Sequence, residues 1–396
     1  MKKLLFFTAL SAFALNASAQ KSKVYSAQNY ANEGKLDKAY EAIQAALDPN
    51  YKKADKMLTW PKTYIAKGQV MRSIALNKNA KYNGLKKELI NPLDSALNAY
   101  IKAADVDAKG RFTKEINAAM MFLITDFTKA ASDAYNAKDY KGASDAFVNV
   151  LKIEEHPVYV GTEPARIDTM IMYNVAIASS AAKMYDRAIE YYAKTQELGY
   201  NGEKCALGII NAYKAQKDTA KALEAMQDAF HKFPTDQGIL VELINYYIQS
   251  KNVEGALTYL DKAIESDPTN ASYYFAKGSV YDNLGDPANA IIAYSKAIEV
   301  KSDFSDAYYN LGAVYYNKGV KFLEVANELP TNEYKKYEEQ KNLANKEFAK
   351  AIPFFEKAAE LNPAEKASFE NLKNLYYRLD MNDKYKAIMK KLDEMN

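Results

Sequence analysis

Alanine recurs at a fixed interval in the middle of this chain. Ala188, Ala222, Ala256 and Ala290 are each 34 residues apart. The same step separates three further sets: Ala229, Ala263 and Ala297; Tyr213, Tyr247, Tyr281 and Tyr315; Pro234 and Pro268. Such a period indicates a repeated supersecondary unit that buries its apolar face against its neighbours. Because a stack of units grows by addition, we expect the 396 residues to form one array without a central core.

The clearest copy of the unit predicts two helices. Tyr274, Gly278 and Tyr281 are spaced i, i+4 and i+7, so they share one helix face, and Gly278 permits close approach of a second helix. The second helix repeats this logic with Ala290, Tyr294 and Ala297. Two antiparallel helices packed through small residues are expected.

The segment between these helices has the residues of a stop followed by a start. Gly285 suits a helix C-terminus, Asp286 an N-cap, and Pro287 the first position of the next helix. The unit is therefore a helical hairpin.

This pattern of aromatic, Gly, Tyr, Ala, aromatic and Ala resembles the tetratricopeptide repeat (TPR) family. Lys277 stands where the family usually has Leu, and Ser302 where it has Pro. The resemblance implies an all-α fold, an α-solenoid in which about eight or nine TPR-like hairpins form a right-handed superhelix. It also implies a surface for binding other proteins.

The N-terminus has the pattern of a secretory signal peptide. Lys2 and Lys3 precede an apolar stretch, and Ala17-Ser18-Ala19 supplies a small-x-small cleavage site. The apolar stretch is too short for a stable membrane span, and no lipoprotein cysteine follows the cleavage site. We expect an exported, periplasmic or extracellular protein of bacterial type without an integral membrane span.

Departures from the period divide the chain. About 16 residues around 77–92 form an inserted connection, since Gly68 and Ala96 are 28 residues apart where Gly278 and Ala290 are 12 apart. The loop His156 to Arg166 is a candidate joint. The expected divisions are a signal peptide at 1–19, irregular hairpins at 20–155, a regular array at 166–319, an insertion at 320–345 and a C-terminal unit with capping helices at 346–396.

The insertion at 320–345 is predicted to prolong two helices. Tyr315 and Tyr376 are 61 residues apart, which is 27 more than one period, and the register resumes behind the insert. Leu329-Pro330-Thr331-Asn332 supplies a turn in its middle. Pro353 then falls inside the second helix, where we expect a kink or a break.

Residues that carry catalytic or metal chemistry are scarce. The chain has two histidines, His156 and His231, and both are interpreted as structural or solvated. Asp105-Val-Asp107 imitates the start of a calcium loop, but Lys109 and Ile116 stand at positions that need oxygen ligands. Cys205 is interpreted as a small buried residue. We expect neither a cofactor nor an enzymatic activity.

In TPR proteins, the second, fifth, ninth and twelfth positions of each first helix line a concave groove that holds a partner peptide. The resemblance carries this role to Lys204, Leu207, Asn211 and Lys214; Val241, Asn245 and Ile248; Ser272, Phe275, Ser279 and Asp282; Tyr309 and Tyr316; and Asn374 and Tyr377. The peptide-binding groove is assigned to eight of them: Lys204, Asn211, Asn245, Phe275, Tyr309, Tyr316, Asn374 and Tyr377. Asparagine amides would bond a peptide backbone and aromatic rings would anchor side chains. The alternative for each is ordinary packing between helices.

The functional hypothesis is a non-enzymatic exported scaffold that binds a protein or peptide partner, with cell-envelope assembly or secretion as its context. The alternative is a periplasmic or surface protein that binds glycans or other nutrients. Nucleic acid is not an expected partner, because 53 basic and 50 acidic residues are well mixed. The partner, the pathway and the oligomeric state do not follow from the sequence, nor does the choice between the groove and the 320–345 insertion as the main binding surface.

Overall fold

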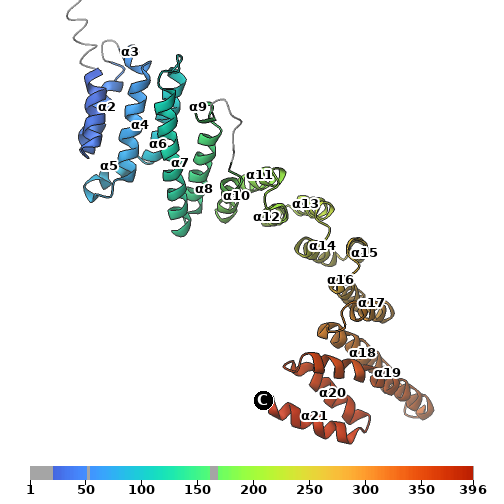
Figure 1. The fold of residues 1–396 in the computed structure, drawn as a ribbon. Coiled ribbons are helices and arrows are strands. Elements are labelled where there is room, and N and C mark those ends of the chain that lie inside the picture. The colour runs from blue at the N-terminus through green and yellow to red at the C-terminus, as the bar shows by residue number, and fades with distance from the viewer. Residues whose placement is uncertain (1–20, 51–53, 161–167, 396) are drawn as a thin grey trace, which may run out of the picture. The chain divides into compact units, whose positions relative to one another are not determined.

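The computed structural model describes residues 21–50, 54–160 and 168–395. The described chain is all-α, an α-solenoid built from successive helical hairpins (Figure 1). Contacts within the chain divide it into two compact units, unit 1 at Met1–Asp218 and unit 2 at Thr219–Asn396. The expected signal peptide lies outside the described residues, as does most of the expected joint at 161–167. None of the described helices is long and apolar enough to cross a membrane.

Unit 1 begins with a helix at residues 21–32. The helices that follow are α2 Leu36–Leu47, α3 Ala54–Leu58, α4 Pro61–Leu76, η1 Ala80–Tyr82, α5 Asn83–Glu88, α6 Pro92–Val106, α7 Thr113–Asn136, α8 Tyr140–Glu154, α9 Pro157–Val160, α10 Thr169–Ala181, α11 Tyr185–Glu197 and α12 Gly202–Ala215. The longer helices pack on their sequence neighbours, as α4 does on α6 and α7 on α8.

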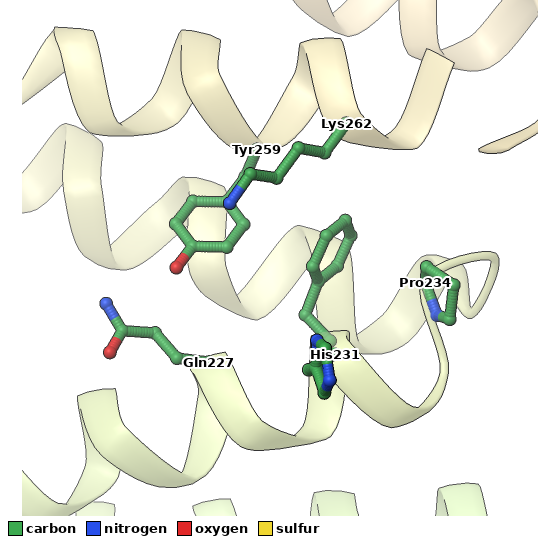
Figure 2. Close-up of a pocket in the computed structure, with 6 residues that line it drawn as sticks. Gln227, His231, Pro234, Tyr259 and Lys262 are labelled. Atoms are coloured by element: carbon green, nitrogen blue, oxygen red, sulfur yellow. The ribbon is translucent and has the colours of Figure 1, made fainter. Parts of the chain in front are cut away.

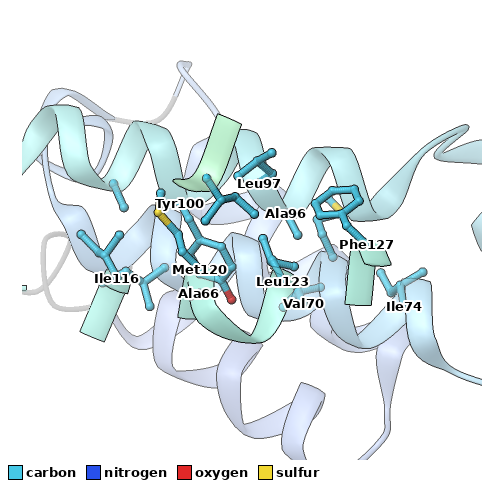
Figure 3. Packing of buried hydrophobic residues seen from close by; sticks show 14 of the residues in the cluster. Ala66, Val70, Ile74, Ala96, Leu97, Tyr100, Ile116, Met120, Leu123 and Phe127 are labelled. Atoms are coloured by element: carbon cyan, nitrogen blue, oxygen red, sulfur yellow. The ribbon is translucent and has the colours of Figure 1, made fainter. Parts of the chain in front are cut away.

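The core of unit 1 lies between α4, α6 and α7. Figure 3 shows side chains of these three helices interdigitating. Ile74, Leu97, Ile116, Leu123 and Phe127 are all almost fully buried. On each helix the buried residues are spaced three or four positions apart, as Ile116, Met120, Leu123 and Phe127 are on α7. This spacing is the amphipathic pattern that buries one face of a helix.

The first insertion folds back on this core. Between α4 and α6 the chain forms η1 and α5, so the extra connection expected near residues 77–92 is present. Tyr82 is buried there, its hydroxyl donates to the Gly34 carbonyl at 2.6 Å, and the Leu36 amide donates to the same hydroxyl at 3.3 Å. One aromatic side chain therefore fastens the insertion to the first hairpin.

Unit 2 is a run of nine helices among its described residues. Their bounds are α13 Thr219–Lys232, α14 Gln237–Gln249, α15 Val253–Ser266, α16 Ala271–Asn283, α17 Pro287–Val300, α18 Ser305–Glu328, α19 Tyr334–Leu361, α20 Lys366–Arg378 and α21 Asn382–Glu394. Consecutive helices pack together throughout the unit. The two helices expected from the spacing of Tyr274, Gly278, Tyr281, Ala290, Tyr294 and Ala297 are present as α16 and α17.

The turn between α16 and α17 has the predicted capping. The Asp286 carboxylate accepts from the Asn289 amide at 3.2 Å, Pro287 is the first helical residue, and Gly285 has a positive φ of 71°. The small residue at Gly278 is also explained, because a Cβ there would lie 2.6 Å from the ring of Tyr294. That ring occupies the space that the missing side chain leaves.

The second insertion prolongs α18 and α19, which pack along each other (Figure 1). They span 24 and 28 residues, so the expected pair of long helices joined by a turn is confirmed. Glu347 on α19 is buried between two lysines: the Lys318 ammonium on α18 lies 3.2 Å from its carboxylate and that of Lys350 lies 2.5 Å away. The Lys318–Glu347 ion pair therefore joins α18 to α19 close to the end of the second insertion.

Of the kink or break expected at Pro353, the break does not occur, and a kink stays a prediction. The helix α19 continues through this residue to Leu361. Proline removes one backbone donor and leaves the carbonyl four residues earlier, at Ala349, without its helical partner. Both Pro353 and Ala349 are exposed, so water can hydrate that carbonyl and the helix tolerates the proline.

Candidate binding surface

One open predicted site lies on α14. Val241 and Ile248 are 52% and 41% exposed, and Asn245 between them is also exposed. These residues are spaced i, i+4 and i+7, so they form one stripe along the helix. The opposite face buries Ile239, Leu240 and Leu243 against the unit. The helix thus presents an apolar, amide and apolar sequence to solvent.

The predicted aromatic anchors are half-buried between helices. The Phe275 ring centroid lies 5.6 Å from that of Tyr294 and 5.0 Å from that of Phe304. Tyr309 packs edge-on against Phe355 at 5.5 Å. Packing between helices therefore uses part of each ring, and only the remaining surface is available to a ligand.

Tyr316 and the predicted residues on α20 differ in their solvent exposure. The Tyr316 ring lies 5.3 Å from Phe348 and is half-buried, whereas Tyr377 is 72% exposed with its ring 5.6 Å from Tyr385. Asn374 is exposed one helical turn before Tyr377. On α20 a side-chain amide and a tyrosine thus share one solvent-facing surface.

The eight assigned residues do not all lie in one unit. Lys204 and Asn211 are exposed on α12 in unit 1, and the other six lie in unit 2. Within unit 2 the contacts connect neighbouring helices: the Asn371 amide of α20 donates to the Tyr309 hydroxyl of α18 at 3.4 Å. The first helices of adjacent hairpins are joined in this way.

A polar chain that the sequence did not predict links α16, α17 and α18. The Asn310 amide donates to the Tyr294 hydroxyl at 3.4 Å, and that hydroxyl donates to the Ser279 Oγ at 3.2 Å. Nearby, burial raises the pKa of Asp282, and Lys321 partly opposes the rise. Ser279 and Asp282 are among the wider set of positions to which the resemblance carries the groove role, whereas Asn310 and Tyr294 are not. No spacing rule could show that the hydroxyl of a packing tyrosine reaches the next hairpin.

His231 lines a small pocket in unit 2. Figure 2 shows it with Gln227, Pro234, Tyr259 and Lys262 around a cavity of about 430 Å³ between α13 and α15. The Lys262 ammonium lies 5.0 Å from the Tyr259 ring centroid, and Gln227 donates to the Tyr247 hydroxyl at 2.9 Å. No acidic residue lines this pocket, so His231 lacks the carboxylate that usually orients a catalytic imidazole there.

A larger cleft lies in unit 1 beside the first insertion. Its volume is about 1140 Å³, and it is bounded by the end of α4, by α5, by the C-terminal half of α7 and by the starts of α6 and α8. Asp94 faces it and accepts from the amides of Asn149 at 2.9 Å and Asn91 at 3.3 Å, while Ile90 stands 83% exposed on its edge. Sequence analysis located the insertion but not the cleft, since side-chain packing decides whether an insertion leaves a space.

The residues considered for chemistry have structural roles. Cys205 is fully buried, and burial raises the pKa of its thiol to about 11, so it stays protonated near neutral pH. The Asp107 carboxylate, at the C-cap of α6, accepts from the amides of Arg111 at 3.0 Å and Phe112 at 2.7 Å and so orders the turn after the helix. His156 Nδ1 accepts from the Val158 amide at 3.3 Å.

Metal ligands are not gathered anywhere in the described part of the chain. Among residues 21–50, 54–160 and 168–395, no three His, Cys, Asp or Glu side chains meet at metal-binding distance.

Comparisons with known proteins agree with the repeat. The tetratricopeptide repeat model matches residues 213–278, and a second TPR repeat model matches residues 284–319. The resemblance inferred from the 34-residue spacing is confirmed over these segments. No curated protein matches the sequence.

Similar solved structures are TPR proteins with low overall similarity. MamA is 22% identical, with 49% of this chain and 91% of MamA covered and a TM-score of 0.36. A TPR repeats protein from Bacteroides fragilis NCTC 9343 is also 22% identical, with 64% and 98% covered and a TM-score of 0.36. YrrB, described as a TPR protein with an unusual peptide-binding site, is 20% identical, with 51% and 91% covered and a TM-score of 0.32.

Proposed function

Because residues 213–278 and 284–319 are tetratricopeptide repeats, we propose that the chain is a non-enzymatic scaffold that holds a segment of a partner protein against the first helices of its hairpins. Repeats of this kind serve as interaction surfaces, and fold alone does not name the partner. The eight residues assigned from the resemblance remain our proposed contacts.

The stripe on α14 is the observation that carries this proposal. The aliphatic side chains of Val241 and Ile248 are exposed to solvent, where they contribute no burial to the hairpin's own packing. Two exposed aliphatic side chains one helical turn either side of an amide suit an extended peptide, whose side chains would cover the apolar groups while the Asn245 amide bonds its backbone. The half-buried rings of Phe275 and Tyr309 extend the same kind of surface on α16 and α18.

The setting of this activity is also part of the proposal. Lys2, Lys3 and the Ala17-Ser18-Ala19 site favour export, so we place the scaffold outside the cytoplasm, in envelope assembly or secretion. Mass measurement of the protein from its native envelope fraction tests this, because cleavage should leave a chain that begins near Gln20. A chain that retains Met1 would exclude it.

The binding test uses exposed residues only, because truncating Tyr309 would also remove its contact with Phe355. The tagged protein is isolated from envelope fractions after cross-linking, and retained partners are identified by mass spectrometry. We expect the variant Val241→Ser, Asn245→Ala, Ile248→Ser to lose the main partner, with recovery falling about tenfold.

The matched control is Ile292→Ser. Ile292 is 66% exposed on α17, a second helix, so this variant removes one exposed aliphatic side chain from the other side of a hairpin. Equal partner recovery by the wild type and the α14 variant would contradict the proposal. The alternative of glycan or nutrient binding is tested by calorimetry with a glycan panel, and saturable binding abolished by the α14 variant would favour it.

A further inference from the structure

An aromatic and cationic surface lies at the start of unit 1, on the helix at residues 21–32 and on α4. The rings of Tyr25 and Trp60 meet edge to face, with centroids 6.0 Å apart and planes at 72°. Trp60 is the N-cap of α4 and precedes Pro61, which restricts it to extended backbone, here φ −98° and ψ 115°. This conformation fixes the direction from which the indole approaches Tyr25.

Two lysines stand over these rings. The Lys21 ammonium lies 5.3 Å from the Trp60 centroid, and the Lys62 ammonium lies 5.9 Å from the Tyr25 centroid. No carboxylate within the described part of the chain forms an ion pair with either lysine. A cation over an aromatic ring is attracted to the ring's π-electrons, but the ring does not neutralise the charge. Two lysine ammonium groups are therefore held beside an aromatic pair.

These groups are accessible. Tyr25 is 48% exposed and Lys21 is exposed, while Trp60 and Lys62 are half-buried. Exposed aromatic area costs free energy in water, and aromatic residues are enriched at the centres of protein interfaces. Nothing in the packing of unit 1 requires the Tyr25 ring to remain outside.

Amide side chains continue this surface along the same two helices. The Gln28 amide donates to Gln69 at 3.3 Å, and the Gln69 amide donates to Asn32 at 2.7 Å. Tyr25, Gln28 and Asn32 are spaced i, i+3 and i+7, so they share one helix face. Amides that both donate and accept suit the backbone of an extended peptide.

We propose that this surface, formed by Lys21, Tyr25, Trp60 and Lys62, binds an acidic segment of a partner protein that also carries an aromatic residue. The carboxylates would pair with the two ammonium groups, and the aromatic ring would pack on Tyr25 and Trp60. The Gln28, Gln69 and Asn32 amides would bond its backbone. A basic segment is disfavoured, because the two lysines repel it. The surface belongs to unit 1 and shares no residue with the α14 site, so each proposal fails independently of the other.

Trp60 makes the surface directly observable. It is the only tryptophan of the chain, so its fluorescence reports on this place alone when excitation avoids tyrosine. The probe is a random copolymer of glutamate and tyrosine, titrated into the purified chain. We expect saturable quenching and a blue shift of Trp60 emission. Raising salt from about 50 to about 300 mM should weaken the binding about tenfold, because exposed charge pairs are screened.

Three comparison polymers test separately the need for an aromatic ring, the sign of the ligand's charge and the class of ligand. Polyglutamate should bind more weakly, since it lacks the ring, and a lysine–tyrosine copolymer should leave Trp60 emission unchanged. Polygalacturonate tests whether an acidic glycan is the true ligand. Tighter binding of polygalacturonate than of the glutamate–tyrosine copolymer would overturn the peptide assignment.

Variants complete the test. Lys21→Gln with Lys62→Gln should weaken the copolymer at least about tenfold, as expected for loss of two charge-assisted contacts. The control pair is Lys109→Gln with Lys114→Gln, two exposed lysines of the same unit. Tyr25→Ser should reduce binding of the copolymer but not of polyglutamate. Circular dichroism checks that each variant is folded. Unchanged Trp60 emission at saturating copolymer, or equal weakening by both lysine pairs, would refute the proposal.

Discussion

The two insertions in the repeat are stabilised in different ways. Residues 77–91 in unit 1 interrupt the helices and fold onto the first hairpin through Tyr82. Residues 320–345 in unit 2 instead lengthen α18 and α19, which satisfy their backbone by continuing as helices and pack on each other. An inserted segment is thus stabilised either by tertiary contact with the stack or by secondary structure of its own.

Local sequence explains the choice. In the first insertion Asn77 and Asn79 each accept a backbone amide two residues on, at 2.8 and 3.0 Å, and Pro92 begins a new helix. Such side chains compete with helical hydrogen bonds and favour turns. In the second insertion the chain carries no glycine or proline between Gly319 and Pro330, so the helix continues until Glu328.

The largest expected effect comes from the tyrosine that fastens the first insertion. Tyr82→Ala removes a buried ring and its hydroxyl contacts, and should destabilise unit 1 by about 3–5 kcal/mol. Tyr334→Ala in the second insertion is the matched change, but Tyr334 is 68% exposed and we expect less than about 0.5 kcal/mol. Urea denaturation measures both.

Trp60 fluorescence reports on unit 1 in this experiment, and circular dichroism reports on the whole chain. Tyr82→Phe separates the ring from the hydroxyl and should cost about 1 kcal/mol. Equal effects of Tyr82→Ala and Tyr334→Ala would show that the two insertions are held alike, and the comparison would fail.

The glycines of the two insertions should respond with opposite signs. A Cβ at Gly319 would lie 2.6 Å from the Phe348 ring, so Gly319→Ala forces α18 and α19 apart and should cost about 1–3 kcal/mol. Gly84 in α5 has no atom within 4 Å of such a Cβ, and Gly84→Ala should stabilise by about 0.5–1 kcal/mol. Thermal unfolding of both variants gives the signs. Loss of stability in Gly84→Ala would mean that α5 packs more tightly than the structure shows.

The repeat made most of the fold predictable. A period of 34 residues locates the hairpins of the regular array, and capping residues such as Asp286 and Pro287 locate the turn between α16 and α17. The break considered at Pro353 does not occur, because this residue lies on the solvent side of α19, where a proline destabilises a helix less than it does on the buried side. The Tyr82 contact with Gly34 joins residues 48 positions apart and has no sequence signal.

The binding surface was less predictable, because exposure depends on neighbours that are distant in sequence. Asn245 is open as expected, yet Phe275 and Tyr309, assigned by the same positional rule, are half-buried against rings of adjacent helices. The Tyr25 and Trp60 pair lies in the irregular hairpins, where the period is weakest and the positional rule has no firm register.

The ion-pair group at the base of the second insertion should make its stability depend on pH. Burial raises the pKa of Glu347, but hydrogen bonds and attraction from Lys350 and Lys318 outweigh this and leave the pKa below its usual value. Stability from a lowered carboxyl pKa is present above the unfolded pKa of about 4.3 and is lost as pH falls through the folded value. Glu347→Gln should therefore lower the free energy of unfolding by roughly 1 kcal/mol at about pH 7, and by much less at about pH 3. Calorimetry at both pH values measures this, and a pH-independent loss would assign the effect to packing.

The smallest expected effect concerns the edge of the unit 1 cleft. Ile90 follows α5 with a φ of 57° and is 83% exposed, so a β-branched side chain occupies the left-handed conformation that glycine prefers after a helix. Ile90→Gly should stabilise unit 1 by about 0.5–1 kcal/mol, measured by Trp60 fluorescence during urea denaturation. The control is Ile292→Gly in unit 2. Ile292 is also exposed but lies within α17, where glycine should lower the free energy of unfolding by about 0.5–1 kcal/mol. Destabilisation by Ile90→Gly would mean that the isoleucine side chain, and not the backbone alone, holds the first insertion in place.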